Sequence, residues 1–153
     1  MTSLEAELRR IHAHLTESHV SFALVGGLAV SARTEPRFTR DADLAVALTS
    51  DAEAEALIHR LRSRDYDVHA IVEHEAVGRL ATVRLTRSQI PHGPVVDLLF
   101  ASSGIEPEIV AEASPLAVLP NLTIGVARTG HLIALKVLSR DDVSRPQDLV
   151  DLR

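Results

Sequence analysis

Acidic residues interrupt two apolar segments of this chain, and this pattern limits the folds that the chain can adopt. Asp41 and Asp43 stand one residue apart in DADLAVA (41–47), and Asp97 stands in the centre of VVDLLF (95–100). Short apolar segments of this kind are typical of buried strands, where an unpaired charge is costly. The sequence therefore predicts a sheet in which an ion or another group binds to the acidic side chains.

The three acids fit a magnesium site. Side chains alternate along a strand, so Asp41 and Asp43 share one face, with Cα atoms roughly 6–7 Å apart. If the strand of Asp97 is a neighbour, three carboxylates converge and repel one another. Mg²⁺ takes oxygen ligands and removes this repulsion, and two such ions support phosphoryl or nucleotidyl transfer. The alternative is structural: Asp41 flanks the strand and Asp97 pairs with a core arginine.

A glycine pair precedes these acids and indicates a phosphate-binding turn. Gly26 and Gly27 follow the apolar strand SFALV (21–25) and lead into a short helix, LAVSAR (28–33). The free N–H groups at the start of a helix bind phosphate oxygens. The dinucleotide-binding pattern G-x-G-x-x-G is absent, which argues against an NAD-binding domain.

The remaining periodicity predicts a single α/β (α+β) domain over residues 1–153, with a mixed sheet and flanking helices. Leu4, Leu8, Ile11 and Leu15 recur at helical spacing near the N-terminus. Further helices are expected at 49–64, near 104–113, from Thr129 to 140, and at 144–153. Further strands are expected at 66–73, 79–86 and 94–101, with a hairpin-like region around 116–126.

The composition argues against three classes: non-specific nucleic-acid-binding proteins, membrane proteins and secreted proteins. The net charge of −5 argues against indiscriminate nucleic-acid binding, and no apolar run approaches the length of a membrane span. The chain has no cysteine, and its start lacks the apolar core of a signal peptide. These features predict a cytoplasmic protein without a membrane partner.

Basic residues are almost all arginine, which makes the exception informative. Lys136 is the only lysine, beside fifteen arginines, and it lies in the apolar helix LIALKVL (132–138). This favours a role in a site over that of a solvated cation. Several arginines either form a basic surface for an RNA backbone or simply solvate a helix and an edge strand: Arg60, Arg62, Arg64, Arg79, Arg84 and Arg87.

Five segments, taken in order, resemble a known superfamily. They are VGGLAV (25–30), PRFTRDADLAV (36–46), VVDLLF (95–100), LIALKVLSR (132–140) and RPQDLVDL (145–152). The first three resemble the nucleotidyltransferase superfamily of the DNA polymerase β type. The last two narrow the resemblance to its AbiEii branch, which includes the MenT-type tRNA nucleotidyltransferase toxins. The resemblance covers nearly the whole chain and implies an enzyme with a minimal nucleotidyltransferase fold.

The resemblance also implies roles for individual residues. Asp41, Asp43 and Asp97 become the metal ligands, and Asp97 also helps to activate the acceptor hydroxyl. Lys136 is expected to reach the triphosphate or the base end of the nucleotide. The other residues expected at the nucleotide are Gly26 and Gly27 at the phosphates, Arg37 and Arg40 as phosphate clamps or partners of the acids, and Asp148, which orients Lys136 or an arginine.

Two features depart from the branch, and a third feature, a threonine before the acids, suggests regulation. Gln147 stands where the branch usually has lysine, so the role of that lysine is either absent here or performed by another residue. The sequence ends at Arg153 inside an expected helix, which predicts either a very small member or one shortened at its C-terminal end. Some relatives are switched off by phosphorylation of a hydroxyl in the loop before the acids. Thr39 is therefore a candidate regulatory site, where a phosphate would block the incoming triphosphate.

The predicted activity is Mg²⁺-dependent transfer of a nucleoside monophosphate, with CTP favoured as the donor, to the 3′ end of tRNA. Blocked aminoacylation would make the protein a toxin with a cognate antitoxin as its partner. The CTP and tRNA assignments come from the resemblance alone. Two alternatives stay open: transfer to a small molecule of the aminoglycoside type or to a protein, and an inactive interaction module. The intact acids and Lys136 argue against the inactive module.

Overall fold

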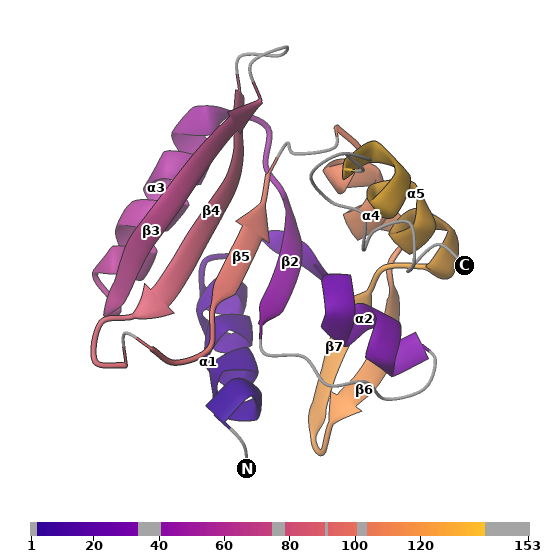
Figure 1. Cartoon of the computed structure of the whole chain (residues 1–153), viewed down its shortest axis with the longest axis horizontal. Coiled ribbons are helices and arrows are strands. Elements are labelled where there is room, and N and C mark those ends of the chain that lie inside the picture. The colour runs from indigo at the N-terminus through magenta and orange to yellow at the C-terminus, as the bar shows by residue number, and fades with distance from the viewer. Residues whose placement is uncertain (1–2, 34–40, 75–78, 91, 101–103, 140–153) are drawn as a thin grey trace.

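A computed structural model gives the arrangement of the chain (Figure 1). It describes residues 3–33, 41–74, 79–90, 92–100 and 104–139. No helix in these ranges has the length and apolar character needed to cross a bilayer. The elements are α1 (Ser3–Glu17), β1 (Ser21–Val25), α2 (Gly26–Arg33), β2 (Ala42–Ala47), α3 (Asp51–Arg62), β3 (Tyr66–His74), β4 (Arg79–Arg87), β5 (Val96–Leu99), α4 (Glu106–Glu112), β6 (Ser114–Leu119), β7 (Leu122–Val126) and α5 (Thr129–Ser139).

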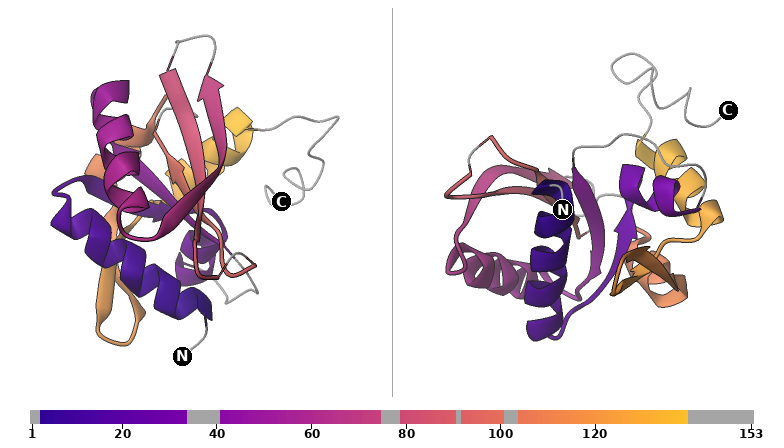
Figure 2. Two further views of the ribbon diagram at one scale, coloured as in Figure 1. Left: turned by 90° about the vertical axis from the view of Figure 1, so that its left-hand side faces the viewer. Right: turned by 90° about the horizontal axis from the view of Figure 1, so that it is seen from below.

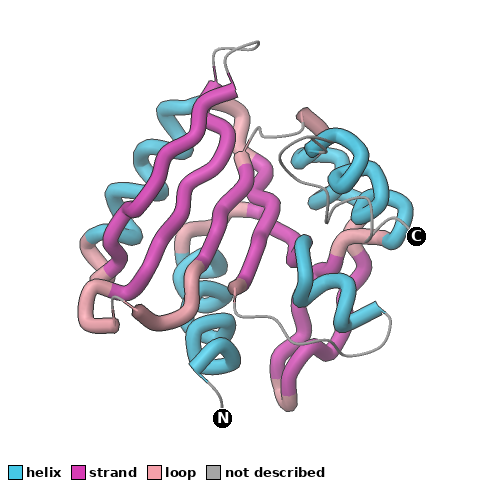
Figure 3. The backbone as a smooth tube through the Cα atoms, in the orientation of Figure 1, coloured by secondary structure: helices cyan, strands magenta, loops and turns pink. Residues whose placement is uncertain are grey.

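The strands form one mixed sheet, as the sequence predicts. Its order is β3-β4-β5-β2-β1-β7-β6 (Figure 3). β2 runs parallel to β5, and β1 runs parallel to β7, whereas the other neighbours are antiparallel. This order places β2, which carries Asp43 and directly follows Asp41, in the centre of the sheet. A central strand is held by hydrogen bonds on both edges, which makes it a rigid support for a site.

Side-chain alternation divides the core between the two faces of the sheet. Leu24, Leu44 and Val46 belong to the larger apolar cluster, which also holds side chains of α1 and α3. Ala23, Val25 and Ala45 point to the opposite face and pack with Ile109 of α4. Leu132 and Leu135 of α5 pack against this second cluster. In Figure 2, α1 and α3 accordingly lie on one side of the sheet and α5 on the other.

Most predicted elements are present, with shifts at their ends. The short helix α2 begins at Gly26 itself, so both glycines lie inside it and not before it. β5 covers only Val96–Leu99 of the expected 94–101, since Pro94 has no N–H to donate to a neighbouring strand. The hairpin expected around 116–126 is β6 and β7. The helix expected at 144–153 lies outside the described residues.

Candidate active site

The sheet brings Asp43 and Asp97 side by side. The two residues are register partners on the parallel neighbours β2 and β5. The residues that flank them, Ala42, Leu44, Val96 and Leu98, all belong to the larger apolar cluster. Alternation therefore directs both carboxylates to the opposite face of the sheet. The two strands are neighbours, which was the condition for the acids to converge, and two acids lie on one patch of sheet.

Gly26 leaves the space that Asp43 occupies. Val25, the last residue of β1, is the register partner of Asp43, and the next residue turns into α2. Gly26 has a φ of 69°, in the left-handed region that glycine adopts without strain. A Cβ atom at this position would lie 2.1 Å from Asp43 Oδ2. The glycine turn and the Asp43 carboxylate are thus in direct contact.

The charges around Asp43 oppose its ionisation. Burial raises the pKa of its carboxyl to about 7, and the charges of Asp97 and Asp41 add to this effect. A side-chain hydrogen bond to Asp97 raises the pKa of Asp43 further, whereas the Arg84 guanidinium lowers it. Asp41 lies just before β2 and belongs to this charge cluster through its effect on Asp43. The protein thus concentrates acids that are difficult to ionise together without a cation.

Asp97 has an arginine partner on the neighbouring strand β4. Arg84 is its register partner there, and its Nε donates to Asp97 Oδ1 at 2.9 Å while Nη2 donates to Oδ2 at 3.0 Å. The Asp97 side chain is only 13% exposed, but that of Arg84 is 52% exposed. The partner is therefore a rim arginine and not the core arginine of the structural alternative.

Sequence reasoning missed this role for Arg84, which it grouped with a basic surface. Alternation on β4 could have found it, because it puts Arg84 on the opposite face from the buried Val83 and Leu85. Other arginines of that proposed surface are also engaged. Arg64 contacts Glu17 at 3.5 Å, and Arg60 donates to the carbonyl oxygen of Ser18. Two further arginines of this surface are therefore held by other groups, one of them by an acid.

Lys136 lies on α5, which packs against α2. Its side chain is partly buried, in a helix whose Leu132 and Leu135 pack against the second apolar cluster. The helix that begins with Gly26 and Gly27 is therefore a direct neighbour of the helix that carries the only lysine. The role of Lys136 at the nucleotide stays a prediction.

Arg33 fixes the far end of α2. Its Nε donates to the carbonyl oxygen of Ala127 at 2.7 Å, and its Nη2 donates to that of Val126 at 2.7 Å and to the hydroxyl of Ser114. These acceptors lie on β6, on β7 and directly after β7, so one side chain ties α2 to the edge of the sheet. Arg33 therefore anchors the C-terminal end of α2.

We expect Arg33→Met to lower the free energy of unfolding by about 2 kcal/mol, because three acceptors lose a charged donor. For a chain of this size, that loss lowers the melting temperature by roughly 4–8 °C. Thermal unfolding followed by circular dichroism measures it, with Arg10→Met on the exposed surface of α1 as the matched control. Equal melting temperatures for the two variants would contradict the anchoring role.

Four predicted site residues lie outside the described part of the chain. They are Arg37, Thr39 and Arg40, which precede β2, and Asp148 in the last motif. Their assignments to phosphate binding, regulation and orientation of Lys136 stay predictions.

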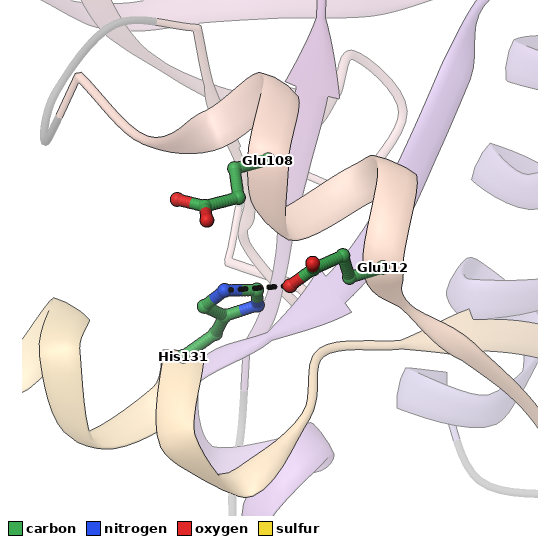
Figure 4. A group of neighbouring side chains, drawn as sticks. All are labelled: Glu108, Glu112 and His131. Carbon is green, nitrogen blue, oxygen red and sulfur yellow. Dashed lines mark ion pairs between the residues drawn. The ribbon is translucent and has the colours of Figure 1, made fainter.

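A second group of acidic and histidine side chains joins α4 to α5 (Figure 4). Glu108, Glu112 and His131 each bring one possible ligand atom within 4.8 Å of the others. His131 Nε2 lies 3.3 Å from Glu112 Oε2, and Arg128 donates to the carbonyl oxygen of Glu112. No spacing motif announces this group, because its histidine lies on another helix. Both glutamates are exposed, and we interpret the group as a contact between the helices.

The donor set at Asp43 and Asp97 fits a hard divalent cation. Carboxylate oxygens are the ligands that Mg²⁺ prefers, and two of these side chains are adjacent across a parallel strand pair. Asp41, just before β2, belongs to the same charge cluster. The glycine turn lies directly against Asp43, and the N–H groups at the start of α2 are donors of the kind that bind phosphate oxygens. The arrangement can hold a metal ion and a phosphate together.

Comparisons with known proteins agree with this geometry. A family model described as "Nucleotidyl transferase AbiEii toxin, Type IV TA system" matches residues 10–153. Among curated proteins, none matches this chain. Three similar solved structures are the lincomycin-bound lincosamide antibiotic adenylyltransferase LnuA, ANT(2")-Ia in complex with adenylyl-2"-tobramycin, and a putative nucleotidyltransferase from Thermotoga maritima.

These structures share the fold at low sequence identity. The identities are 15%, 14% and 14%, with TM-scores of 0.60, 0.62 and 0.60 in the same order. The matches cover 97%, 99% and 97% of this chain and 93%, 86% and 89% of the respective structures. At such identity the likeness shows the nucleotidyltransferase fold alone.

Proposed function

The chain belongs to the AbiEii family of nucleotidyltransferase toxins of type IV toxin–antitoxin systems, and from this premise we propose its donor, acceptor and cofactor. We propose that it transfers CMP from CTP to the 3′ end of tRNA in a Mg²⁺-dependent reaction, which blocks aminoacylation. A cognate antitoxin follows from the family. The observation that carries the catalytic part is the pairing of Asp43 with Asp97 against the Gly26 turn.

In this proposal the 3′-hydroxyl oxygen of the acceptor attacks the α-phosphorus of the nucleotide. The bond to the bridging oxygen of the β-phosphate breaks, pyrophosphate leaves, and Asp97 accepts the hydroxyl proton. Asp41, Asp43 and Asp97 would hold Mg²⁺, which supplies charge stabilisation at the phosphates when bound. The Gly26–Gly27 turn would hold phosphate oxygens through backbone N–H groups, and Lys136 would approach the triphosphate.

A labelling experiment tests the donor and the acceptor. The protein is incubated with total tRNA, Mg²⁺ and each α-labelled nucleoside triphosphate in turn, with Asp41→Ala as the inactive control. We expect label on tRNA from CTP, and its absence with the Asp41→Ala variant. Arg10→Gln, on the exposed face of α1, controls for a general effect of substitution.

A second acceptor class is tested in the same assay. The fold neighbours LnuA and ANT(2")-Ia were solved with lincomycin and with adenylyl-2"-tobramycin, which favours an antibiotic as the alternative acceptor. Parallel reactions therefore contain a lincosamide or an aminoglycoside in place of tRNA. Label on the antibiotic or on protein, with none on tRNA, would contradict the tRNA proposal. No label from any donor would contradict the proposed reaction altogether.

A further inference from the structure

Arg84 binds the Asp97 carboxylate although its exposed side chain could be hydrated by water instead. Half of its side chain is open to solvent, where an arginine is well hydrated, yet two of its nitrogen atoms bind the buried carboxylate of Asp97. Paired N–H donors in this fork fix the plane of a carboxylate as well as its charge. The contact therefore sets how Asp97 presents its oxygens to the site.

The same contact limits what else Asp97 can bind. An ionised carboxylate has about four lone-pair positions on two oxygens, and Arg84 takes one on each oxygen. A divalent cation at Asp97 must therefore share the carboxylate with the guanidinium or displace it.

The positive charge of Arg84 also opposes the binding of a divalent cation at Asp97. The Arg84 guanidinium stays protonated throughout the pH range in which proteins are stable. Its positive charge therefore remains beside the carboxylates when a cation arrives. Two cations that contact one carboxylate repel each other, which weakens the binding of the second.

We infer that Arg84 is a positioning residue for Asp97 that competes with the divalent cation for this carboxylate. In the metal-free protein it neutralises Asp97 and holds its plane beside Asp43. When the cation binds, the fork keeps Asp97 in the orientation in which it accepts the proton of the acceptor hydroxyl. The positioning of Asp97 for catalysis rests on the proposed function. The competition with the cation does not, because it concerns metal binding alone.

Calorimetric titration of the metal-free protein with Mn²⁺ tests the competition without any turnover. We expect Arg84→Gln to bind Mn²⁺ at least roughly threefold more tightly than the wild type, because a competing cation is gone. Arg84→Lys keeps the charge but not the fork, so its affinity should lie between the two. Arg10→Gln, which removes an exposed arginine of α1, should bind as the wild type does.

Kinetics test the positioning. In the transfer assay, Arg84→Gln should lower kcat by roughly tenfold or more and leave the KM of the nucleotide within about twofold, because Asp97 loses its fixed plane. Arg84→Lys should recover part of kcat. A general loss of structure would weaken metal binding and lower kcat together, so tighter binding with a lower kcat identifies the proposed role.

Several results would overturn the inference. Unchanged or weaker Mn²⁺ binding by Arg84→Gln excludes the competition, and an unchanged kcat excludes the positioning. If Arg84→Gln does not fold, the Mn²⁺ affinity of Arg84→Lys tests the competition instead. An affinity equal to that of the wild type would then contradict it. A wild type that transfers no nucleotide, although Arg84→Gln tightens Mn²⁺ binding, contradicts the proposed function and leaves the competition standing.

Discussion

Replacing Asp43 with asparagine is expected to reduce nucleotidyl transfer by more than about 10³-fold, because the site loses a ligand for the cation that stabilises the phosphate charge. Asp43 is the central acid of the cluster, in contact with both Asp97 and the Gly26 turn. Asparagine has nearly the same shape, so the loss reports the charge and not the packing. The rate of label transfer measures it.

The same variant should be more stable than the wild type when no metal is present. The folded pKa of Asp43 is about 7 against an ordinary value of 3.8, so the folded state binds more protons between these values. Wild-type stability therefore falls as the pH rises from about 4 through 7, and asparagine removes this slope. At pH 8 we expect a gain of the order of 2 kcal/mol, and at pH 4 almost none.

Thermal unfolding in the presence of EDTA, at pH 4, 6 and 8, measures this gain. Mg²⁺ should raise the melting temperature of the wild type and have little effect on Asp43→Asn, because a ligand stabilises only the form that binds it. Wild-type activity in the variant would exclude Asp43 from the metal site. A gain in stability that is equal at all three pH values would show that packing causes it, and not the charge.

The pairing of the two acids could be predicted from the sequence because it depends on local rules. Each acid stands inside a short apolar strand, and alternation fixes the face to which it points. The missing step was whether the strands are neighbours, which the observed register of Asp43 with Asp97 supplies. The glycine turn was predicted as a phosphate site, but its close fit against Asp43 needed the three-dimensional structure.

Contacts between distant elements were beyond the sequence pattern. Arg84 is separated from Asp97 by a turn, and only the antiparallel register of β4 and β5 identifies the two as partners. The link from Arg33 to β7 spans more than 90 residues and has no motif. Neither contact leaves a periodic signal, because each depends on a single long side chain that reaches another element.

The structural and catalytic interpretations of these acids are compatible. Asp97 pairs with an arginine, although with one at the rim and not in the core as the structural alternative proposed, and Asp43 forms a hydrogen bond with Asp97. Yet burial and neighbouring charge raise the pKa of Asp43 to about 7, so its ionised form destabilises the folded state. Packing alone gives no reason for an acid at this position. An apolar residue at Asp43 would remove this cost. This cost supports our proposal that a cation binds the acids.

Gly26→Ala is expected to have the second large effect, because it disturbs Asp43 without changing any charge. The new Cβ would lie 2.1 Å from Asp43 Oδ2, so the carboxylate must move. The left-handed φ of 69° adds a penalty of about 1–2 kcal/mol for a residue with a side chain. A displacement of about 1 Å in a catalytic group lowers the rate by roughly 10²-fold, and we expect a loss of this size.

Two other glycines separate the causes of that loss. Gly104 also has a left-handed φ, of 84°, but among the described residues no atom beyond its chain neighbours lies within 4 Å of the position that a Cβ would take there, so Gly104→Ala carries the backbone penalty alone. Gly130 has neither constraint, and Gly130→Ala should leave stability and activity close to those of the wild type. If Gly104→Ala and Gly26→Ala lose equal activity, backbone strain explains the effect. A loss confined to Gly26→Ala, together with weaker Mn²⁺ binding, means that the glycine turn and Asp43 act as one site.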